Sequence, residues 1–341
     1  MKKKIIVTGG LGFIGSNLVK LLIDKNFFVI NIDKVSYSSN FYNLNKIDKK
    51  KYKFYKADIN NQVKINKILN LHKPIGIFNL AAETHVDRSI DSPKKFLDSN
   101  INGVFNLMES VLIYLKKQKE KKFRFIHIST DEVYGDIKKN KKSKEKDPYI
   151  PSSPYAASKA ASDLLIKSYI RTYKFPAIIT NCCNNYGPNQ YPEKLIPRMI
   201  INFKDNLNLP VYGNGKNERE WIHVQDHCLA LLTIFQKGVL GENYNIGSGK
   251  IVRNLDLIKK IIICCKKFLE SKSQIKFVKD RPGHDKRYAL NSNKIRRYLG
   301  WSTKYNFDTG IENTIMWYIS NKQWIKKIIN KKYSKRIGLK L

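Results

Sequence analysis

A glycine-rich turn between an apolar strand and a helix is the feature that most restricts the fold of this chain. Lys4–Thr8 has the apolar content of a buried strand, and Phe13–Asp24 has the pattern of a helix. Gly9, Gly12 and Gly15 fall at the turn between them and at the start of the helix. Small residues there let the backbone approach a pyrophosphate at the helix N-terminus, where free N–H groups favour anions. Alone, the pattern is also typical of a tight turn.

Short apolar runs alternate with helical patterns through the first half of the chain, which is typical of a parallel sheet with crossover helices. We predict strands at Lys4–Thr8, Phe27–Ile32, Lys53–Lys56, Gly76–Leu80, Phe123–Ser129 and Ala177–Asn181, and helices that include Phe13–Asp24 and Asn100–Tyr114. The predicted fold class is α/β, with a Rossmann-type doubly wound parallel sheet and a smaller C-terminal α+β substrate domain.

Proline and glycine interrupt the chain more often after residue 186. We therefore predict an NAD-binding Rossmann domain over residues 1–186 and a mainly substrate-binding domain over residues 187–341. Val224–Phe235 has a helical pattern, and we expect a segment near residues 222–247 to return to the first domain.

The net charge of +36 over 341 residues is extreme and admits two interpretations. A polyanion such as nucleic acid could be the partner. The basic residues are spread along the chain, however, and the densest runs, Lys138–Lys144 and Lys326–Lys340, resemble a solvated loop and a tail. We therefore predict no nucleic-acid partner, with the charge arising from a Lys-, Asn- and Ile-rich composition.

Cysteine usage and hydropathy indicate the compartment. The five cysteines include the adjacent pairs Cys182-Cys183 and Cys264-Cys265, and none lies in a CxxC motif. We expect a reducing compartment, no disulfide framework and no metal site. No apolar run reaches the roughly 18 residues of a membrane helix. The predicted location is cytoplasmic, without a membrane partner.

A carboxylate ends the second predicted strand at Asp33, eighteen residues after Gly15. At that place in a βαβ unit a carboxylate accepts hydrogen bonds from ribose hydroxyls and repels a 2′-phosphate. NAD is therefore the predicted cofactor rather than NADP, with the neighbouring Lys34 as a small argument in the other direction.

A hydroxyl, two carboxylates, a tyrosine and a lysine form the candidate catalytic set. Thr130, Asp131 and Glu132 follow an apolar strand, and Tyr155 and Lys159 form a YxxxK pair on one helix face. An ammonium lowers the pKa of a nearby phenol, which otherwise lies near ~10. A hydroxyl, a tyrosine and a lysine suffice to oxidise an alcohol with a nicotinamide, and the carboxylates suggest that an elimination follows. A helix cap is the alternative role for the carboxylates.

At these residues the chain resembles the extended short-chain dehydrogenase/reductase superfamily and, within it, the dTDP-glucose 4,6-dehydratases. The match runs from the first strand to about Trp317. Beyond the motifs above, the resemblance rests on Leu80–Ser89, Asn184–Pro188, Pro192–Pro197, Arg219–Val224, Arg281–Asp285 and Arg287–Ala289. Several long motifs in the right order are far more specific than either short motif.

The resemblance implies a redox-neutral cycle on dTDP-glucose. Tyr155 takes the C4 hydroxyl proton while hydride passes from C4 to NAD. The 4-ketone acidifies the C5 proton, which Glu132 removes, and Asp131 protonates the C6 hydroxyl, which leaves as water. Hydride then returns to C6, which gives a dTDP-4-keto-6-deoxy-glucose for deoxysugar biosynthesis of the rhamnose type.

The resemblance also implies the binding residues. Cofactor contacts are expected at Gly9, Gly12, Phe13, Ile14, Gly15, Asp33, Lys34, Val35, Ser36, Asp58, Ile59, Leu80, Ala81, Ala82, Ser99, Tyr155, Lys159 and Asn185. Substrate contacts are expected at Thr84, Thr130, Asn184, Lys194, Leu195, Pro210, Val211, Tyr212, Arg219, Asn254, Asp280, Arg281 and His284. A homodimer formed through a helix bundle is expected on the same grounds.

Two other readings stay open from the residues. A related sugar-nucleotide epimerase or decarboxylase, or a dehydratase for another nucleotide, shares most of the motifs, and an epimerase does not need the Asp131–Glu132 pair. Thymine and uracil differ by one methyl group, which is worth only about 1–3 kcal/mol in a pocket. A basic Rossmann-like protein that binds nucleic acid is the non-enzymatic alternative.

Overall fold

A computed structural model describes residues 3–118 and 122–328, and its main sheet has seven parallel strands. The spatial order is β10-β6-β5-β4-β1-β2-β3. The strands are β1 (Lys4–Thr8), β2 (Phe28–Asp33), β3 (Tyr52–Lys56), β4 (Gly76–Asn79), β5 (Arg124–Thr130), β6 (Ala177–Cys182) and β10 (Asn243–Ile246). The predicted fold class is confirmed, and every predicted strand is present with ends moved by at most one residue.

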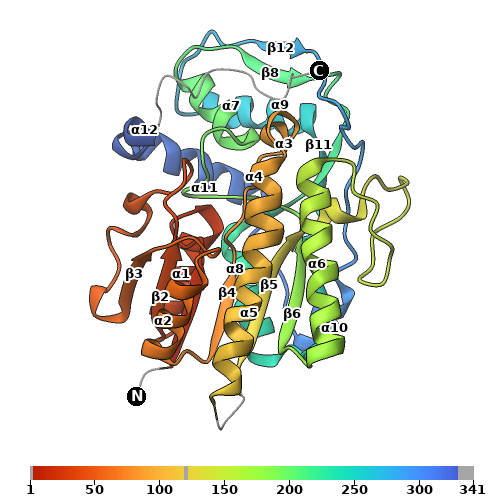
Figure 1. Cartoon of the computed structure of the whole chain (residues 1–341). Coiled ribbons are helices and arrows are strands. Elements are labelled where there is room, and N and C mark those ends of the chain that lie inside the picture. The colour runs from red at the N-terminus through yellow and green to blue at the C-terminus, as the bar shows by residue number, and fades with distance from the viewer. Residues whose placement is uncertain (1–2, 119–121, 329–341) are drawn as a thin grey trace.

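Helices cover both faces of this sheet (Figure 1). One face packs against α1 (Phe13–Asp24), α8 (Val224–Lys237) and α10 (Asn293–Leu299), and the other against α2 (Gln62–His72), α5 (Gly103–Lys116) and α6 (Pro154–Tyr173). The central strands are apolar on both sides because both faces are buried. This arrangement is the doubly wound form, which places a crevice at the carboxyl ends of the central strands.

The helix predicted from Asn100 begins as a different structure. A six-residue π-helical segment, Leu97–Asn102, precedes α5, and two short helices, α3 (Val86–Asp91) and α4 (Lys94–Phe96), come before it. Single π turns inside helices are common beside functional sites. Here the segment carries Ser99, one of the predicted cofactor contacts, at a buried position.

A smaller part with its own apolar core lies at one end of the main sheet (Figure 1). It contains α7 (Leu195–Lys204), α9 (Asn254–Lys266), α11 (Phe307–Ser320) and α12 (Lys322–Ile328). Its strands are β8 (Leu209–Tyr212) with β12 (Ile275–Val278), and β7 (Asn184–Tyr186) with β9 (Glu218–His223) and β11 (Ile251–Arg253). Between these elements the chain returns to the main sheet through α8 and β10.

The two lysine-rich runs differ in structure: one is an exposed loop, and the other begins in a helix. Lys138–Lys142 is exposed, as predicted for a solvated loop, although Arg287 ties it down by donating to the Lys138 and Lys141 carbonyls at 3.0 and 2.8 Å. The first three residues of the predicted tail, from Lys326, belong to α12, and the rest of that run lies outside the described residues. None of the helices within residues 3–118 and 122–328 combines the length and apolar content needed to cross a bilayer.

Candidate active site

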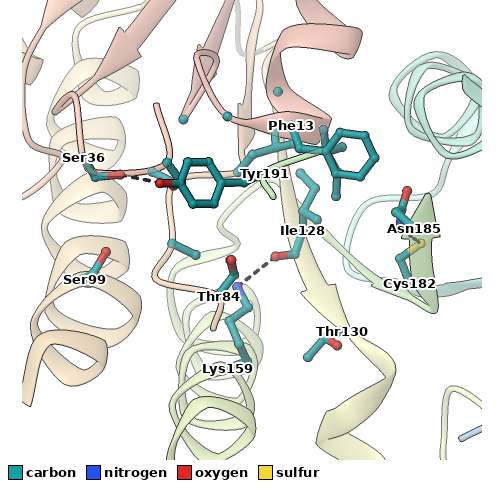
Figure 2. A pocket seen from close by; sticks show the side chains of 18 of the residues that line it. Phe13, Ser36, Thr84, Ser99, Ile128, Thr130, Lys159, Cys182, Asn185 and Tyr191 are labelled. Atoms are coloured by element: carbon teal, nitrogen blue, oxygen red, sulfur yellow. Dashed lines mark hydrogen bonds between the residues drawn. The ribbon is translucent and has the colours of Figure 1, made fainter. Parts of the chain in front are cut away.

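A pocket of about 310 Å³ opens at the carboxyl ends of β1, β4, β5 and β6 (Figure 2). One end is lined by the glycine turn and Asp33, and the other by Thr130, Glu132 and Lys194. The pocket therefore brings the predicted cofactor motif and the predicted catalytic motif into one continuous space.

The glycine turn is packed too closely for larger residues. Gly9 has φ +68°, and a Cβ built on it would lie 2.9 Å from the Ala81 backbone nitrogen. A Cβ on Gly15 would lie 2.2 Å from the Gly9 carbonyl oxygen. Helix α1 starts after Gly12 with no side chain capping it in the described structure, so its first N–H groups face the pocket as an anion site.

Asp33 is held rigidly at the end of β2. Its carboxylate accepts from the Leu11 and Val35 backbone N–H groups at 3.0 and 2.8 Å, and from the Ser39 hydroxyl at 2.8 Å. Lys34 is the residue whose charge would favour NADP. It lies 3.2 Å from Glu83, which pairs that charge. A fixed carboxylate beside a glycine turn fits the ribose and pyrophosphate of NAD.

The catalytic candidates converge from two elements. Thr130 ends β5 and caps the short 3-10 helix Asp131–Tyr134, while Tyr155 and Lys159 come from the first turns of α6. The Thr130 hydroxyl lies 3.2 Å from Asp131 Oδ1 and accepts from the Glu132 N–H at 3.3 Å.

The two carboxylates have different electrostatic surroundings. Burial, followed by the charge of Glu132, raises the pKa of Asp131 well above its usual range. Burial also raises the pKa of Glu132, but the cationic Arg281, Arg219 and Lys194 oppose that shift. Asp131 is thus the carboxyl that favours its protonated form, and Glu132 faces three positive charges that favour a carboxylate.

The causes that set the pKa values of Tyr155 and Lys159 differ from the one that the sequence argument used. Burial and the charge of Glu132 raise the pKa of Tyr155, and the Thr130 hydroxyl opposes that rise only in part. Burial lowers the pKa of Lys159 to about 8, and Asp163 opposes that shift. Lys159 Nζ donates to the Ile128 carbonyl at 2.8 Å, with Thr130 further along the same strand (Figure 2).

Most predicted contacts line the pocket. The cofactor set lies there except for Val35, whose φ of +63° turns the chain after Asp33. From the substrate set, Thr84, Thr130, Asn184, Lys194 and Leu195 line the pocket, and Pro210, Val211, Tyr212, Arg219, Asn254, Asp280, Arg281 and His284 lie outside its lining. The side chain of Val211 belongs to the core of the smaller part.

Several polar residues of the substrate set pair with acidic side chains or a backbone carbonyl of the protein itself. Asp87 on α3 accepts from Arg281 at 3.2 Å and from the Tyr212 hydroxyl at 2.8 Å. His284 lies 2.6 Å from Asp280. Arg219 donates to the Asp285 carbonyl at 2.9 Å and stacks over the Tyr288 ring. The charges of these two guanidinium groups oppose the rise in the pKa of Glu132.

Sequence reasoning missed several lining residues. Cys182, Cys183 and His227 lie beside Asn185. The Asn185 side chain donates to Cys182 Sγ at 3.2 Å, and its Oδ1 accepts from His227 Nδ1 at 2.9 Å. Tyr191 and Glu193 also line the pocket, and Glu193 binds Arg88 at 3.0 Å. The motif Pro192–Pro197 contained a signal for Glu193, whereas His227 comes close only through the return of α8.

The fold and site define a Rossmann-type protein whose dinucleotide-type pocket carries a tyrosine–lysine pair and two acid–base carboxylates. A family model described as GDP-mannose 4,6 dehydratase matches residues 6–314. The chain therefore belongs to the GDP-mannose 4,6 dehydratase family.

Individual relatives narrow the comparison. A probable dTDP-glucose 4,6-dehydratase of Sinorhizobium fredii is 45% identical, over 98% of this chain and 99% of that protein. The crystal structure of the dTDP-glucose 4,6-dehydratase DesIV from Streptomyces venezuelae, solved with NAD bound, superposes with a TM-score of 0.89 at 38% identity and covers 96% of this chain and 100% of that one.

An epimerase is also similar in structure, at lower identity. The UDP-glucose 4-epimerase of Thermotoga maritima gives a TM-score of 0.84 at 28% identity, over 94% of this chain and 99% of that one. The resemblance to dTDP-glucose 4,6-dehydratases that the motifs indicated is confirmed.

Proposed function

We propose that this protein is an NAD-dependent dTDP-glucose 4,6-dehydratase that produces a dTDP-4-keto-6-deoxy sugar. One observation carries the proposal: Asp131 and Glu132 share the pocket with Thr130, Tyr155 and Lys159 and differ in the charges that surround them. Oxidation of an alcohol needs only the last three residues. An acid and a base beside them supply the elimination of water.

The chain's own groups divide the proton transfers. Tyr155 accepts the C4 hydroxyl proton, and Lys159, whose ammonium lies against the pocket wall, holds the cofactor's ribose. Glu132 removes the C5 proton and later returns it. Asp131 protonates the departing C6 hydroxyl. Bound NAD would supply the site that accepts hydride from C4 and delivers it to C6.

The split between acid and base follows from the surroundings. Asp131 is 3% exposed, and its Oδ2 has no hydrogen-bond partner among the described residues, which suits a neutral carboxyl waiting for a hydroxyl. The charges of Arg281, Arg219 and Lys194 oppose the rise in the pKa of Glu132, so its surroundings favour the carboxylate, the form that accepts a proton, more than those of Asp131 do.

The binding residues are part of the same proposal. The glycine turn and Asp33 would hold the pyrophosphate and ribose of NAD, and Arg219 and Arg281 would bind the sugar nucleotide's diphosphate, because guanidinium groups fork oxyanions. The division into a cofactor part over residues 1–186 and a substrate part over residues 187–341, with the return near 222–247, is supported by the separate core of the smaller part. The core of the main sheet also includes Leu290, Ile295, Leu299 and Trp301, so the proposal takes in a second return near residues 290–301.

A homodimer is proposed on the exposed face of α5 and α6, which lie next to each other in Figure 1. Phe105 and Ile113 on α5, and Leu164 on α6, are 41%, 39% and 56% exposed. Large apolar side chains on adjacent helices favour burial against a second copy. Leu164→Glu would shift the protein toward monomer in sedimentation if this face forms the dimer, and an unchanged mass would exclude it.

A cytoplasmic location is proposed because all five cysteines are buried free thiols. Such usage suits a reducing compartment.

Incubation with nucleotide sugars tests the function. Purified protein loaded with NAD is mixed in turn with dTDP-glucose, UDP-glucose and GDP-mannose, and the alkali-induced ultraviolet absorbance of a 4-keto sugar is followed. We expect the fastest signal from dTDP-glucose. A C4 epimer with no 4-keto product would instead support the epimerase, which the overall fold also accommodates.

A further inference from the structure

Behind the pocket, Lys159 meets two buried side chains that the proposed function does not use. Its Nζ lies 3.2 Å from His127 Nε2, and the same ring nitrogen lies 3.4 Å from Asp163 Oδ1. His127 and Asp163 are 0% exposed and lie outside the pocket lining, whereas Lys159 belongs to that lining. The contacts therefore lead from the pocket into the interior of the protein.

The hydrogen bonds of His127 show which form of Lys159 the ring suits. The Thr8 hydroxyl accepts from the Ala81 N–H at 3.1 Å and donates to Asn79 Oδ1 at 2.7 Å. The Asn79 NH2 group is then left to donate to His127 Nδ1 at 3.1 Å, so the proton of the neutral ring lies on Nε2. Burial and the charge of Lys159 keep the ring neutral, because both lower the pKa of His127 well below its usual range. An N–H that faces Nζ suits the lone pair of an amine, and an ammonium needs another partner.

Asp163 supplies the opposite charge. Its Oδ2 accepts three hydrogen bonds, from the Ser129 hydroxyl at 2.7 Å, the Tyr149 hydroxyl at 3.1 Å and the Asn181 amide at 3.3 Å. Its Oδ1 has no hydrogen-bond partner within the described residues and faces His127. Burial raises the pKa of Asp163, while the charge of Lys159 and these three donors oppose the rise. The lysine and the carboxylate therefore each favour the charged form of the other.

Other titratable groups on α6 and the elements packed against it do not replace Asp163. Those that line the pocket together with Lys159 are Tyr155, Asp131, Glu132 and Cys182. Acidic side chains on α3, the π-helical segment and α5 have partners elsewhere: Asp87 pairs with Arg281, Asp98 with Lys94 and Glu109 with Tyr169. Burial lowers the pKa of Lys159 to about 8, and the charge that opposes this shift is that of Asp163.

We propose that Asp163, acting across the His127 ring, keeps Lys159 an ammonium directed into the pocket, so that NAD affinity depends on a carboxylate outside the pocket. Asp163 is thus a positioning residue. The dependence of NAD affinity rests on the proposed function, in which Lys159 holds the cofactor's ribose. Asp163→Asn removes the charge alone, because the amide oxygen can keep the three bonds at Oδ2 and the amide nitrogen takes the place of Oδ1.

The first test reads the charge of Lys159 directly. Ligand-free, full-length protein is treated at a series of pH values with trace acetic anhydride, which acetylates amines and not ammonium groups. Peptide mass spectrometry then gives the pH of half-maximal acetylation for each lysine. In Asp163→Asn we expect this pH to fall by about one pH unit or more at Lys159 and to stay unchanged at Lys194, which lines the same pocket. An unchanged value at Lys159, or equal shifts at both lysines, would overturn the inference.

Two further variants separate the charge from a general loss of stability. Asp226→Asn changes another carboxylate that is 1% exposed and accepts from two backbone N–H groups, so it should leave the acetylation of Lys159 unchanged. An equal shift in Asp226→Asn would contradict a specific role for Asp163. Asp163→Ser removes the same charge, and it carries the same prediction if Asp163→Asn lacks the native circular dichroism spectrum.

Calorimetry with NAD tests the consequence for the cofactor. The NAD dissociation constant of Asp163→Asn should match that of the wild type at about pH 6 and exceed it severalfold at about pH 8. The same ratio at both pH values would contradict the dependence of NAD affinity on Asp163. Wild-type protein that forms no 4-keto product would refute the proposed function, whereas the acetylation result would still decide whether Asp163 controls the charge of Lys159.

Discussion

The two halves of the active-site region are built in opposite ways. The cofactor half, which comprises Gly9–Gly15, Asp33 and Lys34, is shaped mainly by backbone and is open as a pocket. The proposed nucleotide half, which comprises Tyr212, Arg219, Arg281 and His284, is filled by side chains that pair with Asp87, Asp280 and the Asp285 carbonyl. In the proposed function NAD would enter the open first half, whereas the diphosphate of the sugar nucleotide would have to replace or join existing contacts in the second.

The difference follows from where the residues come from. One βα unit supplies the glycine turn, so short-range geometry fixes it. Asp87 and Arg281, by contrast, are 194 residues apart, and only the packing of the smaller part on the main sheet joins them. Asp131 and Glu132, the proposed catalytic carboxylates, connect the two halves, because cations from the nucleotide half act on Glu132.

The largest expected effect is the loss of turnover on substitution of Asp131, one of the two carboxylates that connect the halves. Asp131→Asn removes the acid without changing shape, so we expect turnover to fall by about 10²–10⁴-fold. Oxidation at C4 remains open to this variant, and enzyme-bound NADH should accumulate in absorbance measurements. Tyr155→Phe is the control, since it should form no NADH at all. Normal turnover of Asp131→Asn would show that another group is the acid.

The next largest effect tests the nucleotide half, whose charged side chains pair with other residues of the protein. Asp87→Asn leaves Arg281 buried without its carboxylate, so ligand-free stability should fall by about 3 kcal/mol in urea unfolding. Added dTDP supplies a new anion, and it should therefore stabilise this variant more than the wild type. Asp98→Asn, which disrupts only the exposed pair with Lys94, is the control. A smaller gain from dTDP in Asp87→Asn would mean that Asp87 does not compete with the diphosphate.

A smaller effect is expected from the cofactor half. Gly15→Ala places a Cβ 2.2 Å from the Gly9 carbonyl oxygen, so the turn must open. We expect the NAD dissociation constant to rise by about 10–100-fold, as for one or two lost charge-assisted hydrogen bonds, with dTDP affinity unchanged in calorimetry. At Gly12 the same atom would lie 3.3 Å away, and Gly12→Ala should be milder. Equal losses of NAD and dTDP affinity would contradict the independence of the halves.

The smallest effect is a pH dependence of stability caused by Asp131 and Glu132. Burial raises the folded-state pKa of Asp131 and of Glu132. Their contribution to stability is therefore fully present below the unfolded pKa of about 4 and is lost as pH rises through the folded values. Ligand-free Asp131→Asn should lose less stability than wild type between about pH 4 and 8 in urea unfolding. Parallel curves for the two proteins would refute the raised pKa.

The sequence predicted the cofactor half well because its signals are local. The strand, turn and helix around Gly9 to Gly15 were placed to the residue, and Asp33 ends β2. Thr130, Asp131 and Glu132 were found for the same reason, since they follow one strand directly.

The nucleotide half was predicted less well, because spacing carries no information about long-range contacts. Nothing in the neighbourhood of Arg281 indicates that Asp87 will bind it, and Val211 turned out to face a core. One local signal was available and missed. Asp163 follows Lys159 by one helical turn, is fully buried, and is the carboxylate that opposes the loss of the Lys159 proton.

The path of the hydride tests the central claim most directly. dTDP-glucose with deuterium at C4 is converted by the NAD-loaded protein, and the product is examined by NMR and mass spectrometry. If the halves cooperate as described, the product retains the deuterium and carries it on C6. Deuterium lost to water, or returned to C4 of an epimer, would contradict the account.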